Sequence, residues 1–155
     1  MDQFIRHVAN RVWIKDLFDG QFIEKASELD SCSILYNNKK ISRVSIIATV
    51  VQKFENEDMS YASVTIDDGS ADIRVKTWKD DVDIISNAMI GDLVLLVGKV
   101  KKYNDELYIV PEILKKIDPN WELIHKTILL KNPKTELKAE PSILQAEEIR
   151  FNDNL

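Results

Sequence analysis

The sequence contains few of the residues that build disulfides, metal sites and phosphate-binding loops. Its 155 residues include one cysteine, Cys32, which cannot form an internal disulfide. The two histidines, His7 and His125, are too few for the Cys and His ligand sets of structural zinc. None of the four glycines lies in the Gly-x-x-x-x-Gly-Lys-Ser/Thr spacing that cradles phosphates. These absences argue against a disulfide-stapled domain, a zinc protein and a P-loop enzyme, and we expect no cofactor.

Long hydrophobic runs are also missing. The longest uncharged apolar runs, such as 46–51 and 93–97, are far shorter than the ~20 residues that a membrane-spanning helix needs. The N-terminus does not resemble a secretory signal, because Asp2, Arg6 and His7 interrupt any apolar stretch. We therefore expect an intracellular protein with no membrane association. Its hydrophobic content of 45% is enough for the core of one domain.

Positive charge is in the minority, since 21 Lys and Arg face 26 Asp and Glu for a net charge of −5. Such a charge argues against nucleic acid as a partner, because contacts with phosphates supply much of that affinity. The acids, however, collect in predicted turns and one predicted helix, such as 55–58 and 80–83, whereas most bases lie on predicted strands. Two interpretations stay open, a local basic face or ordinary solvated strand residues.

Strands are predicted through the middle of the chain. Residues 43–53 are rich in β-branched side chains, and polar turns at 55–58 and 67–69 separate the strands that follow. Segment 79–88 opens with acids and spaces its apolar residues as a helix does. Five strands with a helix after the third predict a mainly β chain built on a five-stranded OB-fold barrel, because a sandwich needs more strands. The predicted strands are 43–53, 61–66, 71–78, 93–102 and 106–110.

Extensions flank the predicted barrel. Before it, strands at 11–15 and 21–24 are expected to form a hairpin through a turn at 18–20, and 26–40 is expected to be a loop. After it, Asp118-Pro119 predicts a helix start, with Asp as N-cap and Pro in the first turn. The expected organisation is 1–40 N-terminal extension, 41–117 barrel, 118–132 C-terminal assembly helix and 133–155 polar, partly disordered tail.

The predicted C-terminal helix carries more apolar residues than one helix face can hold. These residues spread over more than one stripe, so packing on the barrel alone would leave some exposed. They are Trp121, Leu123, Ile124, Ile128, Leu129 and Leu130. A helix of a partner would cover the rest. The alternative is a helix that only plugs the end of its own barrel.

One strand combines an aromatic ring with two cations. In 71–78, Arg74, Lys76 and Trp78 share the outward face, because they alternate with residues expected to face the core. An outward aromatic ring can stack on any base for ~1–3 kcal/mol while nearby cations meet phosphates. The alternative is that Trp78 packs under the following helix.

A second set of candidates lies on the fourth predicted strand. Lys99, Lys101 and Tyr103 share one parity, which places Tyr103 at the loop before the fifth strand, a ligand-binding edge of OB barrels. A turn tyrosine that covers the barrel rim is the alternative. Phe54, at the end of the first strand, is a weaker stacking candidate, and Arg43 could contact the nucleic-acid backbone.

Catalytic motifs are not recognisable. The paired acids at 67–68 and 80–81 are explained by turn chemistry and by a helix N-terminus, without a metal. Neither histidine has a nucleophile or an acid beside it in a known motif. We expect a binding protein without enzymatic activity.

Four blocks in order, RVWIKDLFDGQFI, VTIDDGSADIRVKTW, IGDLVLLVGKVKKYNDELYIV and DPNWELIHKTILL, resemble the middle subunit of heterotrimeric replication protein A, most of all its archaeal form. The resemblance covers Arg11 to Leu130. It implies that Trp78 and Tyr103 stack on single-stranded DNA and that the helix after the barrel joins the large and small subunits. The subunit contacts it implies are Trp121, Ile124 and Ile128.

The resemblance further implies a role in DNA replication, repair and recombination, at the chromosomal DNA and in the cytoplasm of an archaeal cell. Members of the family often continue into a winged-helix domain, which is not found in this sequence. Two alternatives stay open, a scaffold subunit with little DNA affinity of its own and an OB module for RNA or tRNA.

Overall fold

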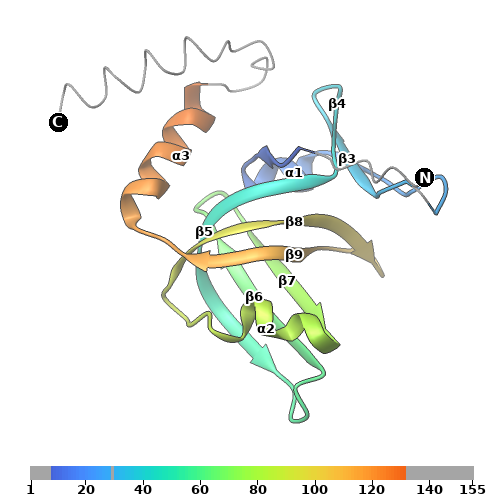
Figure 1. The fold of residues 1–155 in the computed structure, drawn as a ribbon. Coiled ribbons are helices and arrows are strands. Elements are labelled where there is room, and N and C mark those ends of the chain that lie inside the picture. Colours follow the sequence, from blue (N-terminus) through green and yellow to red (C-terminus); the bar gives the residue numbers. More distant parts are fainter. Residues whose placement is uncertain (1–7, 29, 132–155) are drawn as a thin grey trace, which may run out of the picture.

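A closed barrel of five strands forms the centre of the computed structural model, which describes residues 8–28 and 30–131 (Figure 1). The barrel strands are β5 (Arg43–Glu55), β6 (Tyr61–Asp67), β7 (Asp72–Trp78), β8 (Leu93–Tyr103) and β9 (Glu106–Lys116). Strands β5–β6, β6–β7 and β8–β9 pair antiparallel. An antiparallel β5–β8 pairing and a short parallel β7–β9 pairing close the sheet. This arrangement confirms the mainly β chain and the OB-fold barrel.

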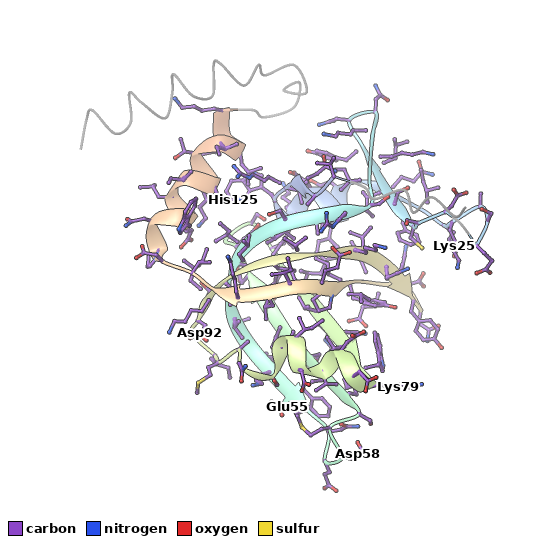
Figure 2. All side chains as sticks on the ribbon, in the orientation of Figure 1. Lys25, Glu55, Asp58, Lys79, Asp92 and His125 are labelled. Atoms are coloured by element: carbon purple, nitrogen blue, oxygen red, sulfur yellow. The ribbon has the colours of Figure 1, made fainter. Side chains whose placement is uncertain are left out.

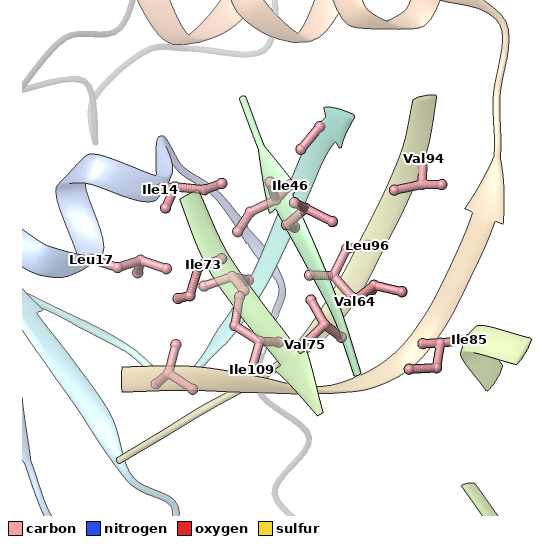
Figure 3. Close-up of a cluster of buried hydrophobic side chains, with 14 of the residues drawn as sticks. Ile14, Leu17, Ile46, Val64, Ile73, Val75, Ile85, Val94, Leu96 and Ile109 are labelled. Carbon is pink, nitrogen blue, oxygen red and sulfur yellow. The ribbon is translucent and has the colours of Figure 1, made fainter. Parts of the chain in front are cut away.

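The core lies inside this barrel because each strand turns alternate side chains inward (Figure 3). Full burial of one aliphatic side chain is worth roughly 1.5–3 kcal/mol, so a dozen of them dominate the stability of the domain. The largest fully buried side chains are Ile14, Leu17, Ile34, Ile46, Ile66, Ile85, Leu96, Ile109, Val44, Val50, Val64 and Val75.

Gly98 lies where β8 bends against β9. The register of this pair shifts between Val97 and Gly98, as expected for a glycine inside a barrel strand. A Cβ atom at Gly98 would lie 2.5 Å from the Val110 carbonyl oxygen and 2.8 Å from Ile109 Cγ2. Glycine is therefore the residue that lets the two strands approach this closely.

A short helical segment follows the third barrel strand, as predicted. It consists of a 3₁₀ turn, η1 (Lys79–Val82), and one turn of α-helix, α2 (Asp83–Ser86). Val82 and Ile85 are buried and close one end of the barrel.

The other end is covered by a helix that the sequence analysis missed. Residues 14–19 were expected within a strand and a turn, but they form α1 (Ile14–Asp19), so the predicted hairpin between 11–15 and 21–24 is wrong. Ile14 and Leu17 are buried at helical spacing. The Ile14 amide donates to Asp68 Oδ2 of the β6–β7 turn at 2.9 Å, a contact that sequence periodicity does not reveal.

The N-terminal extension does contain hairpins, made from other strands than predicted. Strand β2 (Gln21–Ile23) pairs with β3 (Ser33–Tyr36), and β3 pairs with β4 (Lys39–Ile41). The expectation of a loop over 26–40 is therefore wrong. These strands are too short for a period-two pattern to stand out, and their turn, Asn37-Asn38, has positive φ angles of 51° and 63°. A further strand, β1 (Asn10–Arg11), pairs in parallel with β5.

The last described element is α3 (Pro119–Lys131), which stands beside the barrel (Figure 1). Its predicted start is confirmed, since the Asn120 amide donates to Asp118 Oδ1 at 2.8 Å. His125 and Leu129 are buried. The tail predicted for 133–155 lies outside the described residues. No helix in the described part of the chain has the length and apolar content to cross a membrane.

Candidate nucleic-acid interface

Four aromatic rings form a row on the outer face of the barrel, one on each of four neighbouring strands. We call this row the aromatic ladder: Phe54 on β5, Tyr61 on β6, Trp78 on β7 and Tyr108 on β9. The ring centroids are 6.0 Å apart for Phe54–Tyr61, 5.6 Å for Tyr61–Trp78 and 6.0 Å for Trp78–Tyr108. Phe54 is 55% exposed and Trp78 is 43% exposed. The ladder therefore offers aromatic surface to solvent across the width of the sheet.

Strand alternation and register place the rings in this row. On β7, Ile73, Val75 and Thr77 are buried, which turns Trp78 outward. Tyr61 lies opposite Trp78 in the β6–β7 register. Trp78 packs on two outer rings, so it does not lie under the helix that follows it.

The chain turns sharply after Trp78. Lys79 has a positive φ of 54°, and its amide donates to the Ser60 carbonyl at 2.9 Å. This bond ties the end of β7 to the β5–β6 turn, and Figure 2 shows Lys79 at the same end of the barrel as Glu55 and Asp58. The Lys79 side chain is exposed beside the ladder.

The two cations predicted beside Trp78 lie next to the ladder, and one carboxylate contacts both. Lys76 Nζ lies 2.5 Å from Glu106 Oε1 and 4.8 Å from the centre of the Tyr108 ring. Arg74 Nε lies 3.6 Å from Glu106 Oε2. Burial raises the pKa of the Tyr108 hydroxyl, so this ring stays neutral at physiological pH.

An open cavity of about 460 Å³ lies beside the ladder, between β5 and β7. Polar side chains from three strands line it together with two ladder rings, so it presents both stacking and hydrogen-bonding groups. Its lining residues are Gln52, Lys53, Phe54, Tyr61, Ser63, Thr65 and Arg74. Lys53 is turned away from solvent, because its Nζ donates to the carbonyls of Ser86 and Ala88 at 2.6 and 2.8 Å.

The predicted residues of β8 continue the outer face beyond the ladder. Lys101 lies opposite Tyr108, and Lys99 lies opposite Arg43 of β5. Arg43 forms an ion pair with Glu112 at 2.5 Å. Within the described chain, Lys99 and Lys101 form no ion pair, so both can meet an external anion.

Tyr103 lies apart from the ladder. It is 69% exposed at the end of β8, where the turn residues Asn104 and Asp105 have φ angles of 49° and 62°. In the part of the chain that the structure describes, its ring packs on no other aromatic ring. Tyr103 therefore lies at the β8–β9 loop, as predicted. The row of packed aromatic rings lies elsewhere, on the aromatic ladder.

Sequence reasoning missed Tyr61, Tyr108 and Glu106. Each belongs to the outer face through its cross-strand partner, and these partners become known only when the register is known. One signal was available, because the two-residue turn Asn104-Asp105 pairs Tyr103 with Glu106 and so places Tyr108 opposite Lys101.

The three residues predicted for a subunit interface lie on α3 in different environments. Trp121 is 57% exposed, whereas Ile124 and Ile128 are half-buried. Trp121 and Ile124 line a cavity between α3 and the outer faces of β5 and β8. Two further apolar side chains of α3, Leu123 and Leu130, are exposed at 50% and 70%.

OB-folds that bind nucleic acid combine a five-stranded barrel with outer aromatic rings and nearby positive charge. The barrel, the aromatic ladder and the lysines beside it match this description. The family model described as OB-fold nucleic acid binding domain (tRNA anti-codon) matches residues 44–128, more than half of the sequence. The chain belongs to this family. Among the described residues, no group of three or more His, Cys, Asp or Glu is arranged to hold a metal ion.

The chain is also similar to an uncharacterised protein of Methanocaldococcus jannaschii, with 24% identity over 117 residues. The match covers 76% of this chain and 44% of the relative, so the chain spans less than half of that relative's length.

Solved structures share the fold. A replication protein A heterotrimer bound to single-stranded DNA contains a chain 17% identical, with a TM-score of 0.63, covering 78% of this chain and 91% of that one. The Schizosaccharomyces pombe Stn1–Ten1 complex gives 19% identity and a TM-score of 0.70, covering 83% and 93%. Yeast replication protein A bound to single-stranded DNA contains a chain with 20% identity and a TM-score of 0.63. The match covers 84% of this chain and 93% of that one. At such identities the likeness shows the fold.

Proposed function

We propose that this chain is a non-catalytic subunit of a replication-protein-A-like complex, in the place of its middle subunit, and that it binds and protects single-stranded DNA. The aromatic ladder is the observation that carries the proposal. It crosses four strands of the outer face, next to cations, in a family of nucleic-acid-binding domains. Two of the similar structures are replication protein A bound to single-stranded DNA.

The chemistry is stacking with electrostatic support. Bases of a single strand have both faces free, and stacking on an aromatic side chain contributes ~1–3 kcal/mol per base whatever the base is. Lys79, Lys99 and Lys101 form no ion pair within the described chain and supply positive charge to the backbone phosphates. Such a site protects a strand without reading its sequence.

The acidic net charge of −5 supports a division of labour. Three other cations of the face, Arg43, Arg74 and Lys76, are already in contact with carboxylates. We expect a modest affinity in this subunit and a larger contribution from a partner subunit. The role would be carried out at the chromosomal DNA inside the cell, in replication, repair and recombination.

Assembly is assigned to the C-terminal helix. Trp121, Leu123 and Leu130 of α3 keep half or more of their surface exposed although α3 already packs on the barrel. The partner we propose is an apolar helix face of another subunit of the complex. The similar structures are themselves multi-subunit assemblies, a heterotrimer and a Stn1–Ten1 complex.

Fluorescence anisotropy with labelled oligo-dT of about 16 nucleotides tests the DNA-binding proposal, since OB folds occupy ~4–16 nucleotides. We expect the wild-type chain to bind and the double variant Tyr61→Ala, Trp78→Ala to lose at least tenfold in affinity, about one stacked base. The control is Trp121→Ala, which removes an exposed tryptophan from α3 and should bind normally. Equal binding by the ladder variant would overturn the proposal.

The same titration separates the alternatives. A scaffold subunit would show no measurable affinity for oligo-dT while still joining its partner through α3. An RNA module would prefer oligo-U over oligo-dT, because recognition of the 2′-hydroxyl is what distinguishes RNA.

A further inference from the structure

Glu106 is the first residue of β9 and contacts both cations that share the outer face of β7 with Trp78. Its two carboxylate oxygens are shared, with Oε1 at 2.5 Å from Lys76 Nζ and Oε2 at 3.6 Å from Arg74 Nε. Its position is fixed by strand pairing opposite Tyr103. A single acid thus contacts both cations that β7 places on its outer face.

A DNA phosphate needs the same cations that Glu106 holds. Carboxylate and phosphate oxygens accept the same charge-assisted hydrogen bonds from Lys and Arg, so they compete for the donors. The Arg74 side chain is 53% exposed and Glu106 is 39% exposed, which leaves both within reach of an incoming strand. Lys76, at 13%, is held between Glu106 and the Tyr108 ring.

We propose that Glu106 is a built-in competitor of the DNA phosphates, which sets the affinity of the ladder below what its rings and cations could reach. The inference rests on the proposed single-stranded DNA function. Without Glu106, Arg74 and Lys76 become available to two phosphates. With Glu106 present, each contact between one of these cations and a phosphate forms only after the ion pair of that cation with Glu106 has broken. The competitor makes the subunit a weak, easily released binder.

The first test compares Glu106→Gln with wild type in the oligo-dT titration. Glutamine keeps the size and removes the charge, and we expect roughly threefold to tenfold tighter binding because the two ion pairs of Glu106 no longer compete with the phosphates. The matched control is Glu122→Gln on α3, which breaks an ion pair with Lys126 of 2.6 Å and changes the net charge equally. We expect it to bind as wild type does.

Salt dependence and a double-mutant cycle complete the test. Each phosphate newly contacted steepens the plot of log affinity against log salt by about 0.7 for a single strand. We therefore expect a steeper slope for Glu106→Gln. Arg74→Ala should have a small effect in the wild-type background and a clearly larger one in the Glu106→Gln background.

The outcomes separate this inference from the proposed function. If wild type binds oligo-dT through the ladder but Glu106→Gln binds equally or more weakly, the competitor inference alone fails, and Glu106 instead positions Lys76. Equal tightening by Glu122→Gln also overturns it, because net charge would then explain the gain. If neither wild type nor Glu106→Gln binds, both proposals fail. Binding by Glu106→Gln alone supports the competitor.

Discussion

Trp78 owes its position to its neighbours in the sheet. It packs on Tyr61 of β6 and on Tyr108 of β9, with the second pair in an edge-on arrangement of 71°. Tilted and edge-on aromatic pairs gain ~0.5–1.5 kcal/mol beyond their buried area, so the flanking rings hold Trp78 in one orientation. A stacked base then meets a preorganised surface rather than a mobile side chain.

The two tyrosines should therefore matter for binding as well as Trp78. We expect Tyr61→Ala and Tyr108→Ala each to weaken oligo-dT binding by about 1 kcal/mol or more, roughly fivefold or more, while Tyr103→Ala, outside the ladder, has a smaller effect. Phe18→Ala is a suitable control, because this exposed ring lies on α1. A larger loss for Tyr103→Ala than for both ladder variants would place the stacking site at the β8–β9 loop.

The outward face of a single strand could be predicted from the sequence, but the composition of the ladder could not. Alternation along 72–78 is enough to place Arg74, Lys76 and Trp78 on one face. Tyr61 and Tyr108 join them through register, and the β5–β6 register itself shifts between Val50 and Gln52. A local pattern does not contain such long-range pairings.

At the scale of elements, Asp68 connects the barrel to the N-terminal extension. Its Oδ2 accepts from the Ile14 amide at 2.9 Å, and its Oδ1 accepts from the amide and hydroxyl of Ser70 at 2.9 and 2.6 Å. The side chain is 5% exposed. One buried carboxylate thus shapes the β6–β7 turn and satisfies the first turn of α1.

Replacement of Asp68 should loosen this connection. We expect Asp68→Ala to lower the free energy of unfolding by about 2 kcal/mol or more, because buried amides lose a charged acceptor. Asp67→Ala should cost less than about 1 kcal/mol, since its one described bond is to the exposed Gly69 amide. Urea denaturation measures both, and equal losses would contradict the role of Asp68.

His125 makes the packing of α3 sensitive to acid. It points from α3 towards the barrel and is 5% exposed (Figure 2). Burial lowers its pKa from 6.5 to about 4, with Arg11 and Lys126 acting in the same direction and Asp68 against them. Above pH 6.5 the folded and unfolded states are both neutral here. Between pH 6.5 and about pH 4, His125 is protonated in the unfolded state but stays neutral in the folded state.

Stability should therefore fall as the pH drops from 6.5 towards 4, by at most about 1.4 kcal/mol per pH unit from this residue. In the variant His125→Gln, this part of the pH dependence should vanish. Melting temperatures of wild type and variant, measured between these two pH values, provide the comparison. Parallel curves would show that His125 is protonated in the folded state as readily as in the unfolded one.

The elements of the barrel were predictable and those of the extension were not. The long β-branched run of 43–53 and the Asp-Gly turn signal identify barrel strands directly. In contrast, α1 is one and a half turns long and begins at an amide capped by a residue 54 positions away. Strands β2, β3 and β4 of three or four residues carry too few alternations to be recognised.

At the scale of the whole molecule, the ladder and the outer side of α3 are two separate surfaces. DNA binding and subunit assembly should therefore be separable by mutation. We expect the double variant Leu123→Ser, Leu130→Ser to bind oligo-dT normally and to lose association with a co-expressed large subunit of a replication-protein-A-like complex. Size-exclusion chromatography of the co-expressed chains measures the association.

A control of similar exposure lies outside α3, in the turn before β8. Met89 and Ile90, each 66% exposed in the turn before β8, can be changed to serine together. This variant should assemble as wild type does. Assembly lost equally in both double variants, or retained in both, would contradict an interface on α3.

The central claim, that bases stack on the aromatic ladder, is tested most directly by the fluorescence of Trp78. Trp13→Phe, Trp121→Phe leaves Trp78 as the remaining tryptophan of three. Addition of oligo-dT should quench its emission along the same titration curve as the anisotropy of the labelled strand, because base stacking brings a quencher onto the ring. Unchanged Trp78 emission on a saturated complex would contradict the account.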